Sequence, residues 1–302
     1  MENMLRAENK TRKMMPLKVN PKLIDTFTLK HKYDFCVFVT VDYANPNGNP
    51  DNNLPRTDMD DYGMITDVCV KHKIRNVYQI MGQENLVQTP DRAGDGCDSI
   101  EKRARLGIPS GLENPREIAD AACAKWADVR AFGGIMTWLS KETIGIRGPV
   151  TLCTAKSLDP VIIQDLGITK CIQGKADGKG ADTMGGSKDV VEYGVYRITG
   201  AISPLNAAKT GFTDDDAEML KMALMHLFEG DASAARPEGS MEVRKMYWWK
   251  HEEPFPATSS ARIIRNMECE LKDGIDQPRR FEDYKITWNP IDGCVEPEIY
   301  EA

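Results

Sequence analysis

The stretch from residue 45 to residue 56 constrains the fold most strongly, because it suits neither a helix nor a sheet and leads into a helical pattern. It holds five Asn, three Pro and one Gly, a composition that favours turns and leaves backbone amides without regular partners. Side-chain amides and open N–H groups suit phosphate and sugar oxygens without reading base identity. The loop is therefore compatible with a grip on a polyanion, and an ordinary surface loop is the open alternative.

A helix capped by Thr66 or Asp67 is expected after this loop. Lys71 and Arg75 are one turn apart on one flank of the helix, and Lys73 lies on the other flank. Because Lys71 and Arg75 lie off the apolar stripe, reversing their charges should hardly change stability. The cations either add to a polyanion grip or are merely solvated. The apolar stripe consists of Val70, Ile74, Val77, Tyr78 and Met81.

The composition argues against a membrane protein and a secreted one. No apolar run approaches the roughly 18 residues of a membrane span, and the first residues lack the apolar core of a secretory signal. Eight Cys occur without a C-x-x-C pair, so we expect reduced thiols, no zinc site and a cytoplasmic protein. The net charge is −7, yet residues 1–30 hold seven Lys/Arg against three Asp/Glu, and residues 252–302 hold six against twelve. This polarity favours solubility over a role in joining neighbouring copies.

Strand and helix patterns alternate along the chain and predict an α+β fold with a ferredoxin-like or RRM-like sheet. The length of 302 residues leaves one or two domains open. Residues 1–30 are expected to form a basic, poorly ordered N-terminal extension. A helix is expected at 115–127, and a capping box of Thr213 and Asp216 is expected to open another. That last helix should bury Leu220, Leu224, Leu227 and Phe228. The expected strands are 34–41, 129–138, 150–155, 168–172, 193–202, 243–250 and 284–288.

Six segments in the same order resemble the backbone protein of type I-C CRISPR surveillance complexes, a branch of the Cas7 family. The resemblance covers roughly residues 32–285, and it departs from the family at His72, where Arg is usual, at 183–188, at the inserted Pro237-Glu238 and at 253–257. The six segments are 65–76, 128–134, 146–150, 193–197, 209–212 and 233–236.

The resemblance implies a modified RRM-like palm over residues 31–302, with a finger-like insertion at about 82–127 and a thumb hairpin at 173–191. It also implies a non-enzymatic role, in which copies polymerise along a guide (CRISPR) RNA and present it for pairing with target DNA. The implied partners are the guide RNA, target DNA, neighbouring copies of the chain, and the Cas5 and Cas8 subunits. No cofactor, metal or catalytic residue is expected.

The RNA-binding residues expected on this basis combine the loop and helix with later segments. Arg130 and Arg147 lie beside glycines, which either admit a phosphate or serve strand packing with the Arg in a salt bridge. The net charge of residues 173–192 is −1, so this segment is not expected to attract RNA by charge. The resemblance instead implies that Met184 inserts as a wedge between bases. The expected RNA-binding residues are Asn47, Gly48, Asn49, Asn52, Arg56, Lys71, Lys73, Arg75, Arg130, Arg147, Met184, Lys188 and Arg236.

An enzymatic alternative is a metal-dependent endoribonuclease that uses loop carboxylates. The candidates are four aspartates, Asp42, Asp51, Asp58 and Asp67. No His accompanies them in the loop, and Asp51 or Asp58 equally well caps a turn. Trp248 and Trp249 lie in a predicted strand, so at most one faces a nucleic acid, and core packing is favoured.

Overall fold

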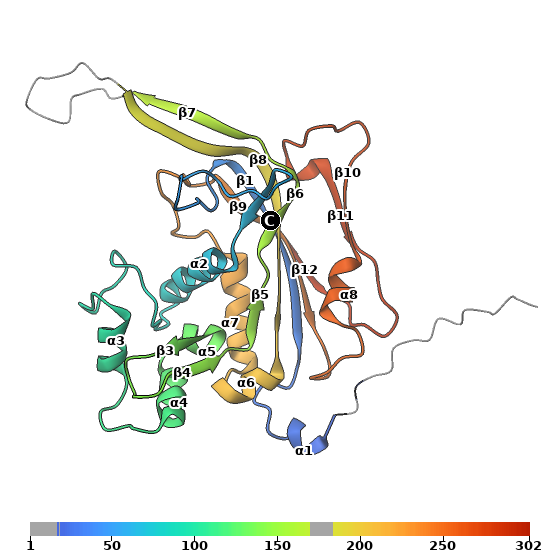
Figure 1. The fold of residues 1–302 in the computed structure, drawn as a ribbon. Coiled ribbons are helices and arrows are strands. Elements are labelled where there is room, and N and C mark those ends of the chain that lie inside the picture. Colours follow the sequence, from blue (N-terminus) through green and yellow to red (C-terminus); the bar gives the residue numbers. More distant parts are fainter. Residues whose placement is uncertain (1–16, 18, 170–183) are drawn as a thin grey trace, which may run out of the picture.

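A computed structural model describes residue 17, residues 19–169 and residues 184–302 (Figure 1). Within them lies an eight-stranded antiparallel sheet in the order β12-β9-β1-β8-β6-β2, and β5 and β7 join it by pairing with β8. The strands are β1 (Tyr33–Ala44), β2 (Tyr62–Ile65), β5 (Val150–Leu152), β6 (Ala155–Pro160), β7 (Ile163–Thr169), β8 (Met184–Ile202), β9 (Met241–Lys250) and β12 (Glu298–Glu301). Of the expected α+β fold, the structure confirms a mixture of helices and strands with an antiparallel sheet.

Two small hairpins and several helices surround the sheet. The hairpins are β3 (Gly133–Met136) with β4 (Ile144–Arg147), and β10 (Met267–Leu271) with β11 (Tyr284–Trp288). The helices are α1 (Pro21–Ile24), α2 (Asp67–Ile80), α3 (Ile100–Gly107), α4 (Pro115–Lys125), α5 (Ala127–Phe132), α6 (Pro204–Thr210), α7 (Asp214–Met225) and α8 (Ser260–Arg265), with a 3₁₀ turn at Phe281–Asp283. In the part of the chain that the structure describes, no helix is both long and apolar enough to cross a membrane.

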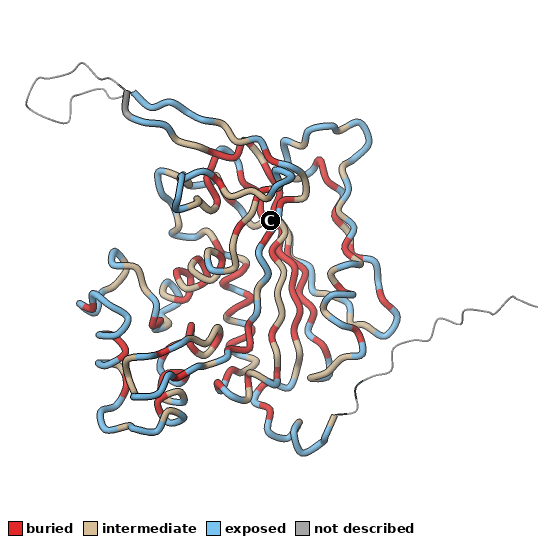
Figure 2. The backbone as a smooth tube through the Cα atoms, in the orientation of Figure 1, coloured by how far each residue is buried: buried red, intermediate tan, exposed pale blue. Residues whose placement is uncertain are grey.

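The sheet is buried on both faces, because alternate residues of its central strands enter two different cores. Phe35 and Val37 of β1 pack with the apolar faces of α2 and α7. Cys36 and Phe38 pack on the other side with α8 and the β10–β11 hairpin. β1 is accordingly buried without interruption from Tyr33 to Val41, and the central strands carry long buried stretches, red in Figure 2. This double cover explains why β1 reads as a nearly continuous apolar run rather than as an alternating one.

Trp248 and Trp249 of β9 confirm the core-packing interpretation. Trp248 belongs to the core beneath α2 and α7, Trp249 belongs to the core beneath α8, and both are 0% exposed. The Trp248 ring stacks on Phe35 at a centroid distance of 5.6 Å, and the Trp249 ring stacks on Tyr247 at 5.9 Å. Neither ring is accessible to a nucleic acid.

A third core lies apart from the sheet and is formed by residues between Leu86 and Ile146. It joins α3, α4, α5 and the β3–β4 hairpin, at the lower left of Figure 1. The expected strand at 129–138 is wrong in its first half, which is the helix α5. Ala131 packs into the core under α2 whereas Val129 packs into the third core, so both sides of this short helix are apolar and imitate a strand.

Other predicted elements hold with changed limits. Strands 34–41, 193–202, 243–250 and 284–288 are confirmed within β1, β8, β9 and β11. The helix at 115–127 is α4, and the Thr213–Asp216 capping box is present at the start of α7. The strand expected at 150–155 is divided into β5 and β6. Residues 168–169 of the strand expected at 168–172 belong to β7, which already begins at Ile163, and 170–172 lie outside the described residues.

Candidate nucleic-acid interface

Three Asn side chains use their carbonyl oxygens to hold the 45–56 loop together. Asn49 and Asn52 each accept from the backbone N–H two residues ahead, at 3.2 and 3.0 Å, and Asn47 accepts from the Thr66 amide at 2.9 Å. Such turns are the usual role of Asn in irregular backbone. In the described part of the chain, the NH₂ groups of these three side chains have no acceptor. They remain donors for an external oxygen.

The backbone of the loop is less open than its composition suggests. Asn49 N donates to Leu54 O at 2.8 Å and Arg56 N donates to Asn47 O at 3.1 Å, and Gly48 forms a bridge with Pro55. The expected free backbone amides are therefore partly consumed by a short internal hairpin. The side-chain amides, rather than the main chain, supply the donors on this surface.

The helix α2 begins where the sequence predicts. Thr66 is the N-cap, and its hydroxyl oxygen accepts from Cys69 N at 3.2 Å. Four of the five stripe residues are buried, whereas Met81 is the C-cap residue and is 40% exposed.

Lys71 lies at the surface in the first turns of α2. Its ammonium pairs with Asp67 at 2.9 Å, and the two side chains are 24% and 35% exposed. The hydrogen bond from Lys71 is the largest influence that holds the pKa of Asp67 below its usual range. Exposed pairs of this i,i+4 kind contribute little to stability, so Lys71 can exchange its partner for a phosphate at small cost.

Arg75 is directed into the protein instead of outward. Its Nε donates to Asp128 at 2.8 Å, and the Asp128 carboxylate, 1% exposed, also accepts from Leu86 N and Val87 N at 2.8 and 3.1 Å. The guanidinium lies 5.3 Å from the ring centroid of Phe132. The position of Arg75 off the apolar stripe is therefore not a reason to expect that charge reversal leaves stability unchanged, because its partner carboxylate is buried. Arg75 joins α2 to the start of α5.

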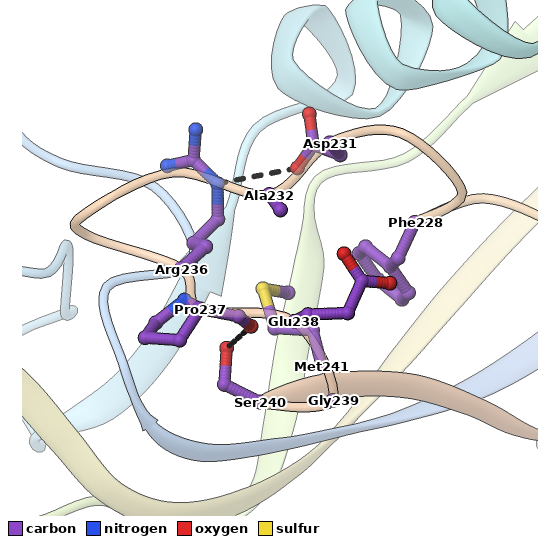
Figure 3. Close-up of a pocket in the computed structure, with 9 residues that line it drawn as sticks. All are labelled: Phe228, Asp231, Ala232, Arg236, Pro237, Glu238, Gly239, Ser240 and Met241. Atoms are coloured by element: carbon purple, nitrogen blue, oxygen red, sulfur yellow. Dashed lines mark hydrogen bonds and ion pairs between the residues drawn. The ribbon is translucent and has the colours of Figure 1, made fainter.

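Lys73 is buried and forms an ion pair with Asp231, in the loop after α7. The Lys73 side chain is 2% exposed and the Asp231 side chain is 8% exposed. The same carboxylate oxygen accepts from Arg236 Nε at 3.2 Å, and Arg236 Nη1 donates to the Asn45 carbonyl at 3.3 Å. Figure 3 shows Arg236 and Asp231 facing each other at the rim of a small hollow. Lys73 is thus an internal residue, while Arg236 is 28% exposed.

Arg56 completes a cluster of charges around Cys69. Burial raises the pKa of the Cys69 thiol, Lys73, Arg236 and Arg56 oppose this rise, and Asp231 reinforces it. Arg56 Nε is buried and has no hydrogen-bond partner, while the Arg56 residue as a whole is partly exposed. The cluster contains three cations, Arg56, Lys73 and Arg236, and one carboxylate, Asp231. Its net charge beside the Asn loop is therefore positive.

Arg130 and Arg147 have different surroundings. Arg130 binds both oxygens of Asp216, with Nε at 3.0 Å from each and Nη2 at 2.7 Å from one, so the salt-bridge alternative holds for it. Arg147 is exposed at the end of β4. A Cβ at Gly133 would lie 2.1 Å from Ile146 O, and one at Gly148 would lie 2.4 Å from Ala131 O. These two glycines permit close packing of the chain's own backbone.

The thumb expected at 173–191 corresponds to the outer part of the β7–β8 hairpin, which projects from the sheet in Figure 1. Lys188 lies on β8 opposite Leu166, and Met184 is the first residue of β8, opposite Thr169. Nothing about the Met184 side chain is described. Lys175, Lys179 and the rest of 170–183 also lie outside the described residues.

The four candidate carboxylates are not gathered into one site. Asp58 pairs with Lys156 at 2.5 Å, and this hydrogen bond is the largest influence that lowers the pKa of Asp58. Asp67 pairs with Lys71, and Asp51 is exposed at the loop tip. Among the described residues, no three His, Cys, Asp or Glu side chains come together as metal ligands.

Two carboxylates that bind cations of α2, Asp128 and Asp231, were not identified from the sequence. Asp128 directly precedes the Val129-Arg130 pair in one of the six resemblance segments, which is a signal that could have drawn attention to it. Asp231 lies just before the segment that contains Arg236, and no local pattern marks it. Both act on residues of α2 from distant parts of the chain.

The profile of the family described as CRISPR-associated protein Cas7 matches residues 31–289. A solved structure described as "CRISPR RNA-guided surveillance complex, pre-nicking" is 13% identical, with a TM-score of 0.45, over 72% of this chain and 77% of its own. Another, described as "CRISPR RNA-guided surveillance complex", is 12% identical, with a TM-score of 0.42, over 72% and 68%. A search of curated proteins finds no match.

Proposed function

Since this chain belongs to the CRISPR-associated Cas7 family, we propose that it is the non-enzymatic backbone subunit of a type I-C surveillance complex. Several copies bind along one guide RNA and hold its bases for pairing with target DNA. The sheet with α2 and α7 serves as the RRM-like palm, the third core as the finger and the β7–β8 hairpin as the thumb. Base pairing supplies the sequence specificity, and the protein supplies the shape.

The observation that carries this proposal is the placement of donors without internal acceptors on one surface. The NH₂ groups of Asn47, Asn49 and Asn52 have no acceptor in the described part of the chain. Arg56, which is partly exposed, lies beside them, with its backbone N–H bound to the Asn47 carbonyl. Donors of this kind match phosphate and sugar oxygens, which repeat along any RNA. We therefore assign sequence-independent backbone binding to this surface.

The cations divide into binding and supporting groups. Lys71 and Arg236 are 24% and 28% exposed and Arg56 is partly exposed, so we assign direct phosphate contacts to the ends of these three side chains. Lys73 and Arg75, which are held by buried carboxylates, keep α2 in place. Arg130 has the same supporting role toward Asp216 at the start of α7, while Arg147 and Lys188 extend the surface toward the finger and the thumb.

The thumb hairpin provides a surface for a neighbouring copy. Leu166 and Ile168 of β7 are 39% and 47% exposed, and residues two apart on a strand share one face. An apolar stripe on a projecting hairpin favours contact with another protein surface. We assign this contact to the next copy along the guide, and the Cas5 and Cas8 subunits to the ends and side of the resulting array.

The role we propose includes no RNA cleavage. Asp58 and Asp67 already pair with Lys156 and Lys71. Lysine pairing leaves these two carboxylates poorly suited to hold a catalytic divalent ion. The family's scaffold role needs only positioning of the RNA.

The test is direct measurement of RNA binding. Purified protein should bind two unrelated single-stranded RNAs of equal length with the same affinity, and protein isolated from cells that express a guide should carry RNA of uniform length. Arg56→Gln should weaken binding, whereas Arg280→Gln, which changes a 78% exposed Arg near β11, should not. Strong sequence preference, or equal effects of the two substitutions, would contradict the proposal.

A further inference from the structure

Asp231 lies where three separate segments meet. Its carboxylate receives the ammonium of Lys73 from α2 and the guanidinium of Arg236 from the following turn. Arg236 in turn donates to the carbonyl of Asn45 at the start of the Asn loop, and Asn45 N donates back to Ala235 O at 2.9 Å. The helix, the turn and the loop are thereby joined through one acidic side chain.

Arg236 is held in a defined orientation by these contacts. The turn that carries it is closed by backbone hydrogen bonds between Ser233 and Arg236 at 2.8 and 3.1 Å. Nε is bound to Asp231 and Nη1 to Asn45, and Nη2 has no partner among the residues that the structure describes. In Figure 3 the two terminal nitrogens of Arg236 lie on the side away from Pro237 and Ser240. The Nη2 group of a planar guanidinium is thus left for an outside acceptor.

We propose that Asp231 is a positioning residue for RNA: it fixes the Arg236 guanidinium and the Asn loop so that both meet the same stretch of phosphate backbone. This inference rests on the proposed function. The positioning role and simple charge repulsion predict opposite changes in RNA affinity when Asp231 is removed. A carboxylate close to a phosphate site repels RNA, so removal of Asp231 would strengthen binding if charge alone mattered. If Asp231 positions Arg236, its removal weakens binding.

A substitution that keeps the net charge separates these effects. The variant Lys73→Met/Asp231→Asn removes one positive and one negative charge from a buried pair, and such replacements are often tolerated by the fold. We expect it to retain the wild-type circular dichroism spectrum and to bind single-stranded RNA roughly tenfold more weakly, the size expected for one lost charge-assisted hydrogen bond. The slope of log affinity against log salt should fall by roughly 0.7, the value for one phosphate contact on a single strand. The matched control is Lys245→Met/Glu301→Gln, which removes a 2.5 Å pair between β9 and β12 and should bind RNA like the wild type.

A double-mutant cycle with Arg236→Gln completes the test. This substitution should cost roughly tenfold in the wild-type background and less than about twofold in the Lys73→Met/Asp231→Asn background, because Arg236 is no longer oriented there. Arg236→Lys keeps the charge and leaves the Lys73–Asp231 pair intact, and it should lose nearly as much affinity as Arg236→Gln. If the Lys73→Met/Asp231→Asn variant does not fold, the RNA affinity of Arg236→Lys tests the proposal instead.

The outcomes distinguish this proposal from the proposed function. If the wild-type chain fails to bind RNA, both are overturned. If the wild type binds, but the charge-neutral variant or Arg236→Lys binds equally well, backbone binding stands and the positioning role of Asp231 is refuted. Equal costs of Arg236→Gln in the two backgrounds refute it as well.

Discussion

Arg75 gives the sharpest test of how α2 is held in place. The side chain is 14% exposed and its Nε binds a carboxylate, Asp128, that is 1% exposed. Arg75→Gln leaves this carboxylate without its cation. Breaking a buried pair from one side costs about 3–5 kcal/mol, and the two backbone N–H groups that still bind Asp128 favour the lower end. We expect a loss of about 3 kcal/mol.

The comparison is with Lys71→Gln, one turn earlier on the same helix. Its i,i+4 pair with Asp67 is exposed, and such pairs contribute about 0.3–0.5 kcal/mol. Urea denaturation followed by circular dichroism should separate the two variants, and Tm should fall by roughly 6 °C for Arg75→Gln. Arg75→Lys, which retains the charge but not the guanidinium geometry, should fall between them. Similar small losses for both Gln variants would show that Asp128 is adequately held by its backbone donors, and the argument from burial would fail.

Further predictions address RNA, chemistry and assembly. Lys71→Glu should weaken RNA binding and lower the salt slope by at least roughly 0.7, with little loss of stability, and an unchanged slope in salt titrations would remove Lys71 from the interface. With Mg²⁺ or Mn²⁺ present, bound RNA should stay intact on denaturing gels in the wild type and in Asp51→Ala alike; metal-dependent cutting that Asp51→Ala abolishes would favour the endoribonuclease instead. Leu166→Ser/Ile168→Ser should leave the monomer folded but reduce regular filaments on long RNA seen by electron microscopy, and filaments of normal length would count against the hairpin contact. Gly148→Ala should reduce soluble expression, because the new methyl group would meet backbone atoms at 2.4 Å; a normal yield would mean that the hairpin can shift.

Local patterns predicted the elements whose partners lie nearby in sequence or act through simple burial. Val70 and Ile74 show the helical period of α2, and Thr213 with Asp216 marks the start of α7 by a reciprocal cap. These features depend on a few neighbouring residues, so the sequence alone reveals them.

The roles of the cations depended on distant residues. A helical wheel places Lys73 and Arg75 on the flanks of a stripe but cannot show what lies opposite. Lys73 meets a carboxylate 158 positions away, and Arg75 meets one 53 positions away. The same limit applies to α5, whose two apolar sides face different cores and thereby imitate a strand. Tertiary packing decides these cases, and single-sequence periodicity does not contain it.

The β7–β8 hairpin has a mechanical consequence. β8 is one strand of 19 residues that begins in the projecting hairpin and ends in the middle of the sheet, paired with β1. β7 has seven residues, so the described part of the paired ribbon is about 23 Å long at the usual rise per residue. In the array proposed above, a ribbon anchored in a buried sheet would set the separation at which two copies touch. Side chains change face with every residue. If Leu166 and Ile168 are to keep their present face, the ribbon can be lengthened only by two residues in each strand, about 7 Å at a time. If copies are arrayed along a guide RNA as proposed, their spacing would then change in steps and not continuously.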